Sequence, residues 1–255
     1  MPDFEELIAE GEAEPTEGWD FSWFDGRATE ERTPWGYVRL AAGALGGARA
    51  SLDVQTGGAE VYAEALGSAA SVPARVAATE EWPPNLVLAR ARLAPFGGEV
   101  AQVLATEPFP HPDRTFDVVL ARHPYSVPWE EIARVLASGG TFLGQLIGWG
   151  TNRRLYEFFL GPQGDAHEDH GHEAVLRMRL AAVGLEAVRL EEAVTKVEFF
   201  DVGAVVYFLR KVLWTVPGFT VTAYRDELRR MHALITANGS FVSYSRRFLV
   251  EARKS

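Results

Sequence analysis

The stretch SLDVQTGGAE at residues 51–60 joins an apolar run to a turn that holds two adjacent glycines. The run ends near Asp53, and the helix-compatible segment GAEVYAEALGSA begins inside the turn. This order predicts a buried strand, a tight loop and a helix, the local arrangement from which nucleotide-binding loops are built. A dinucleotide-binding dehydrogenase carries G-x-G-x-x-G at this place, and TGGAEV does not match that pattern. The stretch therefore favours a nucleotide site of another kind.

The segments around this stretch alternate between strand and helix patterns. Strands are expected at ASLDV, ARVAATE, EVAQVLAT, TFDVVLARH and TFLGQLIG, with helices before and between them. Prolines open the helix PPNLVLARARLAPF, and Gly139 and Gly140 end the helix WEEIARVLAS. This alternation predicts an α/β fold, in which a mostly parallel sheet has helices on both faces and binds ligands at the carboxyl ends of its strands.

The last third of the sequence has a different pattern. Strands are expected at EAVRLEEAVTKVEFF and at the closing SFVSYSRRFLVEAR. Two helix patterns, DVGAVVYFLRKVLW and TAYRDELRRMHALITANG, lie between these strands, one more than simple alternation requires. We therefore expect a helical insertion at residues 201–238 near the substrate side. Its apolar faces fit core packing, or a hydrophobic pocket for a planar or lipidic acceptor.

Acidic side chains are concentrated at the beginning of the sequence. Residues 1–31 hold 11 acids and one base, Arg27, which accounts for the whole net charge of −10. The remaining residues hold 24 acids and 24 bases without a basic stripe, so a nucleic-acid partner is disfavoured. We expect residues 1–33 to form an acidic arm and residues 34–255 to form one domain.

The arm begins with FEELIAEGEAE, which predicts a short amphipathic helix with Phe4, Leu7 and Ile8 on one side. Aromatic residues follow in GWDFSWFDGR. Two interpretations stay open: the arm packs on the body through these aromatics, or it closes over a ligand as a lid.

Several classes of protein are excluded by composition. The sequence has no cysteine, which excludes disulfides, cysteine nucleophiles and thiolate metal sites. It has no run of 18 apolar residues, so no membrane-spanning helix is expected. Its acidic beginning is unlike a secretory signal or a transit peptide, and a cytoplasmic location is the expectation.

Taken in order, the segments LDVQTGGAE, RVAATE, TEPFPHPDRTFDVVLAR and EIARVLASGGTF resemble the class I S-adenosylmethionine-dependent methyltransferases. The resemblance covers residues 45–150, and SFVSYSRRFLVEAR is similar to the family's last strand. It implies a Rossmann-like, seven-stranded, mostly parallel sheet with an antiparallel last strand and a helical insertion before it. It also implies S-adenosylmethionine as cofactor and S-adenosylhomocysteine as product.

The resemblance assigns the cofactor site residue by residue. The first loop approaches the methionine part of the cofactor, Glu80 accepts hydrogen bonds from the ribose hydroxyls, and Trp82 offers a flat face to the adenine. The expected cofactor-binding residues are Asp53, Gln55, Thr56, Gly57, Gly58, Glu80, Glu81, Trp82, Thr106, Glu107 and Arg122.

The first loop also departs from the family pattern, because Gln55 and Ala59 occupy glycine-like positions. The amide of Gln55 either points at the cofactor carboxylate or fills the pocket. The third strand reads QVLATEPF without the usual acid, so the adenine amine is left to Thr106, to Glu107 or to the backbone.

Residues for the transfer step are expected after the fourth and fifth strands. His123 is the candidate base because its ordinary pKa is near neutral, and Tyr125 is a candidate orienting hydroxyl. A hydrogen-bonded strand-end side chain is the other interpretation of His123, and Arg122 either binds an acidic substrate group or pairs with a nearby acid. The loop GWGTNRR supplies the expected substrate-binding residues Trp149, Asn152 and Arg153.

The run AHEDHGH combines imidazoles with carboxylates, which together can bind a divalent metal ion. The run is short and polar, and no further ligand is identifiable elsewhere, so a solvated loop is preferred and no metal site is predicted. The residues in question are His167, Glu168, Asp169, His170 and His172.

The sequence thus predicts methyl transfer from S-adenosylmethionine to a small-molecule acceptor, for which an aromatic or hydrophobic group is one expectation. Two alternatives stay open: an RNA methyltransferase, and a non-catalytic binding protein with a degenerate cofactor loop. The acceptor, the methylated element and the oligomeric state are not predicted.

Overall fold

The computed structural model describes residues 3–16, 21–104, 106–164 and 173–255. The chain divides into two units, each built from segments that are distant in the sequence. Unit 1 takes in residues 1–32, 150–167 and 194–246, and unit 2 takes in residues 33–149, 168–193 and 247–255. The acidic arm therefore belongs to the same unit as the helical insertion.

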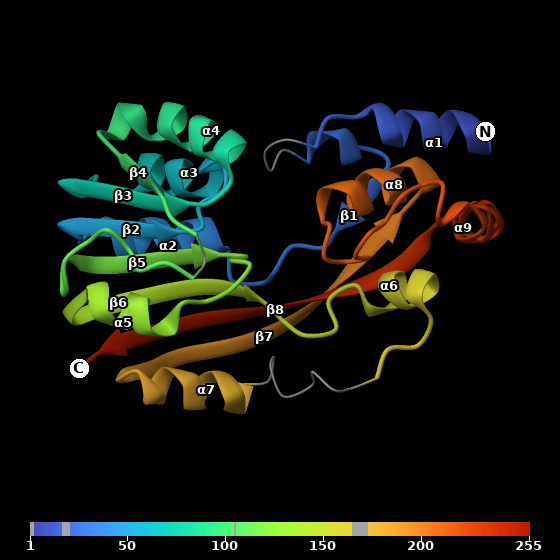
Figure 1. Cartoon of the computed structure of the whole chain (residues 1–255). Coiled ribbons are helices and arrows are strands. Elements are labelled where there is room, and N and C mark those ends of the chain that lie inside the picture. Colours follow the sequence, from blue (N-terminus) through green and yellow to red (C-terminus); the bar gives the residue numbers. More distant parts are fainter. Residues whose placement is uncertain (1–2, 17–20, 105, 165–172) are drawn as a thin grey trace. The chain divides into compact units, whose positions relative to one another are not determined.

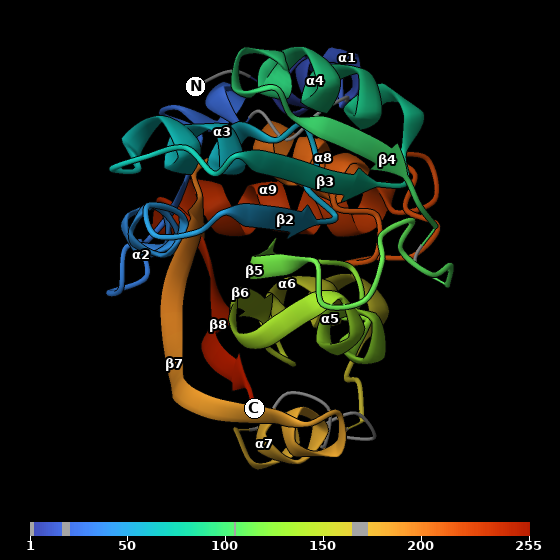
Figure 2. The ribbon, with the colours of Figure 1, turned by 90° about the vertical axis from the view of Figure 1, so that its left-hand side faces the viewer.

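Unit 2 contains the predicted parallel sheet. All five residues of the strand ASLDV are buried, because helices cover both faces of a parallel sheet and leave neither side of a central strand in water. This strand, β2, lies between β3 and β5, and Figure 2 shows the three side by side. The parallel strands are β2 (Ala50–Val54), β3 (Arg75–Glu80), β4 (Glu99–Gln102), β5 (Phe116–Arg122) and β6 (Leu136–Ile147).

Helices cover both faces of this sheet, as predicted. Successive side chains of a strand point to opposite faces, so Val118 and Leu120 join one core while Val119 and Ala121 join the other. The first core is closed by α2 (Tyr37–Leu45), α3 (Glu60–Ser68) and α4 (Pro83–Leu93), and the second by α5 (Trp129–Val135) and α7 (Glu173–Ala182).

The whole sheet has the order β1-β7-β8-β6-β5-β2-β3-β4. β8 (Phe241–Lys254) runs antiparallel to β6, which confirms the predicted orientation of the last strand. β7 (Leu185–Phe199) lies on the other side of β8. The short β1 (Ala28–Glu30), which the sequence did not predict, pairs antiparallel with β7 as an eighth strand. Figure 1 shows β7 and β8 as long strands, and their residues are divided between the two units.

Unit 1 is mainly helical. The two helices predicted between the last two strands are present as α8 (Val202–Lys211) and α9 (Arg225–Asn238). They share an apolar core with α1 (Phe4–Ala13) and α6 (Arg153–Leu160). In α1 the predicted apolar side is buried, and Asp3 and Glu6 form a capping box at its first turn. Single-turn 3-10 helices occur at Ser22–Phe24 in unit 1 and at Ala94–Phe96 in unit 2.

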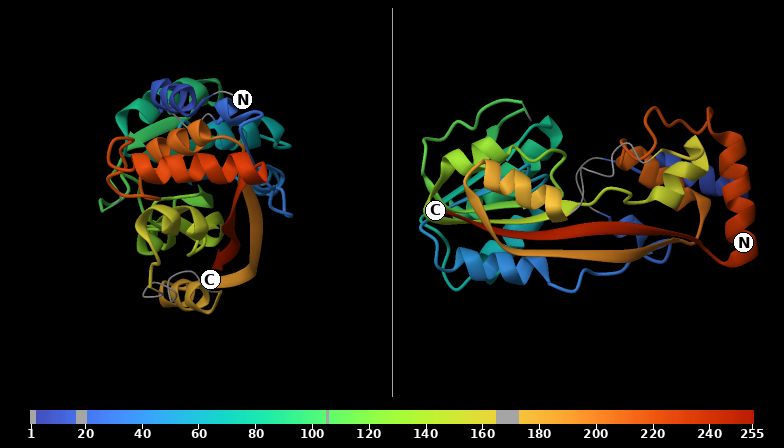
Figure 3. Two further views of the ribbon diagram at one scale, coloured as in Figure 1. Left: turned by 90° about the vertical axis from the view of Figure 1, so that its right-hand side faces the viewer. Right: turned by 90° about the horizontal axis from the view of Figure 1, so that it is seen from below.

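Glycines allow α1 to lie very close to α8, and Figures 1 and 3 show the two helices side by side. A Cβ on Gly11 would lie 2.4 Å from the carbonyl oxygen of Gly203. Arg210 donates hydrogen bonds to the carbonyls of Gly11 and Glu14 at 2.7 and 2.9 Å. The acidic arm is therefore packed within unit 1, and its role as a lid stays a prediction.

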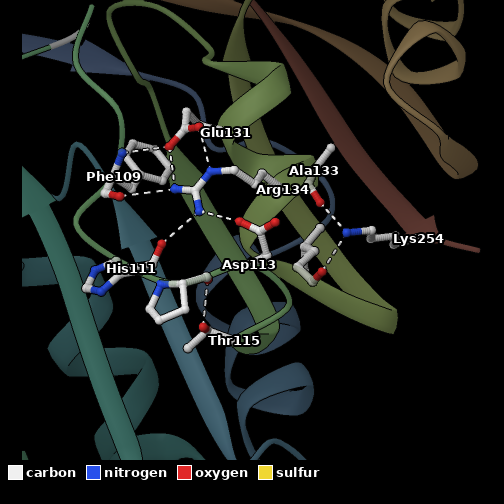
Figure 4. A network of polar contacts seen from close by, with 10 residues as sticks. Phe109, His111, Asp113, Thr115, Glu131, Ala133, Arg134 and Lys254 are labelled. Atoms are coloured by element: carbon white, nitrogen blue, oxygen red, sulfur yellow. Dashed lines mark hydrogen bonds and ion pairs between the residues drawn. The ribbon is translucent and has the colours of Figure 1, made fainter.

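Arg134 on α5 fastens the segment between β4 and β5 to that helix (Figure 4). Its guanidinium donates to Glu131 at 2.7 Å, to Asp113 at 2.8 Å and to the carbonyls of Phe109 and His111 at 3.0 and 2.8 Å. The hydrogen bonds to Glu131 and Asp113 raise the pKa of Arg134, so the group stays charged. One side chain thus binds this segment at Phe109, His111 and Asp113.

Replacing Gly11 with Ala should lower the free energy of unfolding by about 1–3 kcal/mol, because the new methyl group overlaps backbone atoms of α8. Urea denaturation measures the change. The control is Gly43→Ala in α2, where a Cβ meets nothing within 4 Å and should stabilise the helix by about 0.5–1 kcal/mol. Equal effects at the two positions would contradict the close contact.

Replacing Arg134 with Met should cost about 1–3 kcal/mol of unfolding free energy, because the part-buried Glu131 and two carbonyls lose their donor. The matched variant is Arg177→Met, which removes an exposed ion pair with Glu173 and should change stability by less than about 0.5 kcal/mol. The same urea assay compares the two variants. A loss of less than about 0.5 kcal/mol for Arg134→Met would show that other contacts hold the segment between β4 and β5.

Candidate functional site

The site lies where the order of the parallel strands reverses, in unit 2. β2 and β5 are neighbours, but the helices that follow them, α3 and α5, cover opposite faces of the sheet. The loops after the two strands therefore diverge, and ligands of such sheets bind at this switch point. Asp53 pairs with Leu120 and Val54 with Ala121, so both strands end at the same level.

The loop after β2 has a left-handed backbone at alternate residues. Gln55, Gly57 and Ala59 have φ angles of 53°, 63° and 62°. The interpretation of Gln55 and Ala59 as glycine-like positions is thus confirmed, and each non-glycine residue costs about 1–2 kcal/mol in this conformation. Strain of this kind is typical of loops that serve a site.

Asp53 is 6% exposed and lies at the start of this loop. Its carboxylate accepts a hydrogen bond from the Thr56 hydroxyl at 2.6 Å. Burial raises the pKa of Asp53 to about 7, against the lowering effects of this hydrogen bond and of Arg122. Asp53 is therefore a carboxyl group that changes charge near neutral pH.

Glu80 is the last residue of β3, and its side chain binds the backbone of the loop after β2. The side chain is 6% exposed, and its two oxygens accept the N–H of Gly57 at 2.8 Å and of Trp82 at 2.9 Å. The Thr56 N–H also donates to the carbonyl of Thr79 at 2.9 Å. The structure thus brings together the loop and the second acid, as the sequence predicts. Trp82 is 42% exposed and opens α4.

The side chain of Gln55 ties this loop to the loop after β5. Its Oε1 accepts the N–H of Tyr125 at 2.6 Å, and its Nε2 donates to the carbonyl of Ser126 at 2.8 Å. Both ends of the amide are therefore engaged within the protein. A direct role of Gln55 toward a cofactor carboxylate stays a prediction.

His123, one residue beyond β5, also has a left-handed backbone, with a φ of 55°. Its N–H donates to the carbonyl of Gln145 at 2.8 Å, and its ring Nε2 lies 2.8 Å from Nε2 of the Gln145 side chain. Burial and the charges of Arg122 and Arg247 hold its pKa well below the ordinary value. Its predicted role as base stays a prediction.

No protein-family model and no curated protein matches the sequence. Solved structures do match its fold. A proposed methyltransferase from Bacillus halodurans has 20% identity and a TM-score of 0.58, over 85% of this chain and 96% of that one. Geranyl diphosphate methyltransferase, in complex with GPP and sinefungin, has 14% identity and a TM-score of 0.50, over 86% and 76% of the two chains. This chain has the Rossmann-like methyltransferase fold.

The methyltransferase fold also carries other chemistry. The cyclase SpnF matches with 17% identity and a TM-score of 0.52, over 85% of this chain and 80% of that one. The fold alone therefore does not decide the reaction, which has to be argued from the site.

Other predicted residues lie around this edge of the methyltransferase fold. Thr106 and Glu107 are exposed in the loop after β4, where Glu107 accepts the N–H of Leu104 at 3.0 Å. Glu81 is half-buried, and Gly58 is buried where a Cβ would lie 2.3 Å from the Glu60 carboxylate.

The predicted substrate residues are divided between the units. Trp149 belongs to unit 2, while Asn152 and Arg153 begin α6 of unit 1. Arg153 donates to Glu157 on its own helix at 2.8 Å. The Oδ1 atom of Asn152 is buried without a hydrogen-bond partner among the described residues.

The run His167–His172 lies outside the described residues. Within the residues that the structure describes, no group of three or more histidine or acidic side chains could hold a metal ion. In the same part of the chain, no helix is long and apolar enough to cross a membrane.

The sequence interpretation missed Gln145 and Trp35. Gln145 is 4% exposed within β6, and its Oε1 accepts the Trp35 Nε1–H at 2.7 Å. The signal was available, because Gln145 is the one amide inside the apolar strand pattern TFLGQLIG. A polar side chain inside a buried strand needs partners, and those partners mark a site.

Replacing Asp53 with Asn should stabilise the protein more at pH 8 than at pH 5. The folded-state pKa of about 7 lies above the ordinary value of 3.8, so the folded state binds the proton more tightly. The stability that the protonated form contributes is present below about pH 4 and is lost as the pH rises through 7. Denaturation at the two pH values measures the difference, which should exceed about 1 kcal/mol.

The control for this pH dependence is Asp117→Asn, for which no difference between pH 5 and pH 8 is expected. Asp117 accepts the N–H groups of Arg49 and Ala50 at 2.9 and 3.0 Å. Although burial acts to raise it, these hydrogen bonds leave the pKa of Asp117 lowered from 3.8, so its stabilising effect is fully present at both pH values and is lost only below about pH 4. A pH-independent difference for Asp53→Asn would contradict the raised pKa.

Proposed function

We propose that this protein is an S-adenosylmethionine-dependent methyltransferase that acts on a small-molecule acceptor. The observation that supports the proposal best is the position of Glu80. It ends the strand beside β2, and it binds the backbone of the loop at the switch point. In the resembling family an acid at this place accepts the ribose hydroxyls.

The residues present fit this cofactor. Each oxygen of Glu80 accepts one backbone N–H and keeps a further lone pair, so the carboxylate can still accept two hydroxyl groups. The exposed Trp82 offers an adenine a flat apolar face. Asp53, Thr56, Gly57 and Gly58 would hold the methionine part, and the bound cofactor supplies an activated methyl group.

The protein's own contribution is then to align the acceptor and to exclude water. Arg122, His123 and Tyr125 follow β5 at the switch point, and we assign them to the acceptor side. Trp149, Asn152 and Arg153 are proposed as further acceptor-binding residues. The net charge is acidic, and residues 32–255 hold equal numbers of acids and bases, which favours a small acceptor over RNA.

A specific observation favours the second candidate function, a binding protein without methyl transfer. Gln55 stands where a glycine would leave the loop open, and its amide is bonded to the loop after β5. A loop that is closed in this way would take no cofactor, so cofactor binding separates the two functions.

Isothermal titration with S-adenosylhomocysteine tests the proposal. The wild-type protein should bind, and Glu80→Ala should weaken binding by about 1–3 kcal/mol, the scale of hydrogen bonds to a charged group. The control is Glu64→Ala, an exposed acid on α3 whose loss should leave the affinity unchanged.

Absence of binding to the wild type would favour the binding protein without methyl transfer. Equal affinities of Glu80→Ala and the wild type, with thermal melts that show both folded, would show that another acid holds the ribose.

A further inference from the structure

Gln145 connects two rings at the edge of β6 in unit 2. Its Oε1 lies 2.7 Å from Nε1 of Trp35, and its Nε2 lies 2.8 Å from Nε2 of His123. Gln145 and Trp35 are 4% and 3% exposed, so these bonds are shielded from water. The hydroxyl of Thr33 is a second, longer donor to the same Oε1, at 3.4 Å.

The donors in this chain of contacts fix the position of a proton. An indole N–H only donates, so the atom of Gln145 that faces Trp35 must be its oxygen. The amide nitrogen then faces His123, and because that nitrogen also only donates, His123 Nε2 must be the acceptor. An imidazole that accepts at Nε2 is neutral and carries its proton on Nδ1.

The other nitrogen of this ring is free to meet a ligand. Nδ1 of His123 has no hydrogen-bond partner in the part of the chain that the structure describes, and it is not among the buried unpaired atoms there. The ring is also held from its backbone, which is left-handed and bonded to the Gln145 carbonyl. A held ring with one accessible N–H is a directed hydrogen-bond donor.

Charge around the ring favours an anionic partner for this donor. Arg122 and Arg247 are the two groups whose charges lower the pKa of His123. Arg122 is exposed at the end of β5, directly before His123 in the chain. The exposed guanidinium of Arg122, adjacent in the chain to this neutral N–H donor, favours an oxygen that carries negative charge.

We propose that Trp35 and Gln145 hold His123 as the neutral Nδ1–H tautomer, which donates a hydrogen bond to a carboxylate of the ligand bound beside β5. The proposal rests on the proposed function and names the chemistry that this part of its site recognises. Trp35 and Gln145 are positioning residues, and His123 touches the ligand. The carboxylate belongs to the acceptor or to the amino-acid end of the cofactor.

This assignment gives His123 a different task from proton removal. The lone pair that a base needs is on Nε2, and Gln145 already occupies it. The pKa of His123, lowered first by burial and then by the two arginines, also keeps the ring neutral at physiological pH.

The tautomer is measured directly in the unliganded protein by long-range proton–nitrogen NMR of ¹⁵N-histidine, with His123→Gln identifying the signal. The expected spectrum shows a protonated Nδ1 and an unprotonated Nε2. Gln145→Glu should move the proton to Nε2, because a carboxylate accepts from both Trp35 and His123. Gln163→Glu, at an exposed position, should leave the spectrum unchanged.

If Gln145→Glu fails to fold, Trp35→Phe provides the second variant. It removes the donor that orients the amide, so Gln145 can rotate and the tautomers should become mixed. A wild-type signal with the proton on Nε2 would overturn the proposal, and so would a tautomer that neither variant changes.

Three probes then distinguish the source of the carboxylate. S-adenosylhomocysteine has an amino-acid end, 5′-methylthioadenosine lacks it, and benzoate added to the S-adenosylhomocysteine complex represents an acidic acceptor. A shift of the His123 Nδ1 proton with the first probe but not the second assigns it to the cofactor. A shift with benzoate assigns it to the acceptor.

No shift with any probe that binds would overturn the ligand role. Calorimetry of S-adenosylhomocysteine reports separately on the proposed function. Failure of that binding would count against methyl transfer, while the tautomer spectra of the unliganded protein still decide whether Trp35 and Gln145 hold His123 in the Nδ1–H form.

Discussion

Parallel pairing of β2 with both of its neighbours is the constraint on which the rest of the structure depends. A central parallel strand is covered on both faces, which leaves its carboxyl end as the place where polar groups can gather. The peptide groups just beyond this end lose their ladder partners, and buried N–H groups need an acceptor. Glu80 supplies one for Gly57 and Trp82, and the carbonyl of Gln145 supplies one for His123. The position of Glu80 in the site thus follows from the unpaired N–H groups at the ends of the strands.

The side chains of two glutamines each join separate elements at this edge of the sheet. An amide side chain has a donor nitrogen and an acceptor oxygen, so it can bind a carbonyl on one element and an N–H on another. An ionised carboxylate only accepts and could not bind the carbonyl. Gln55 joins the loop after β2 to the loop after β5, and Gln145 joins β6 to His123 and Trp35. Through these bonds the loop after β2 and the residues after β5 form one connected network.

The alternating strands and helices of unit 2 could be predicted from the sequence because their signals are local. Apolar runs of strand length and prolines at a helix start act over a few residues, whereas Gly139 and Gly140, which were expected to end the helix, lie within β6. β1 was missed because three residues carry no periodicity, and its pairing with β7 is a long-range contact. The boundary of α5 also differed: the helix ends at Val135, and β6 begins at once with Leu136.

The candidate site divides in the same way. Asp53 and Glu80 could be found because each ends a recognisable strand. The bonds of Gln55 and the tautomer of His123 could not, because they depend on partners 70 and 22 residues away. The two glycine-like positions were visible only through comparison with a family pattern, and their backbone angles give the physical reason.

The contact between α1 and α8 has a consequence for how the chain is made. Gly11 and Arg210 are separated by 199 positions, and synthesis proceeds from the amino-terminal side at about 5–20 residues per second. The apolar side of α1, with Phe4, Leu7 and Ile8, therefore remains without its native partner for roughly 10 seconds or more. Net charge of one sign, such as residues 1–31 carry, opposes association between copies of a segment during such a delay.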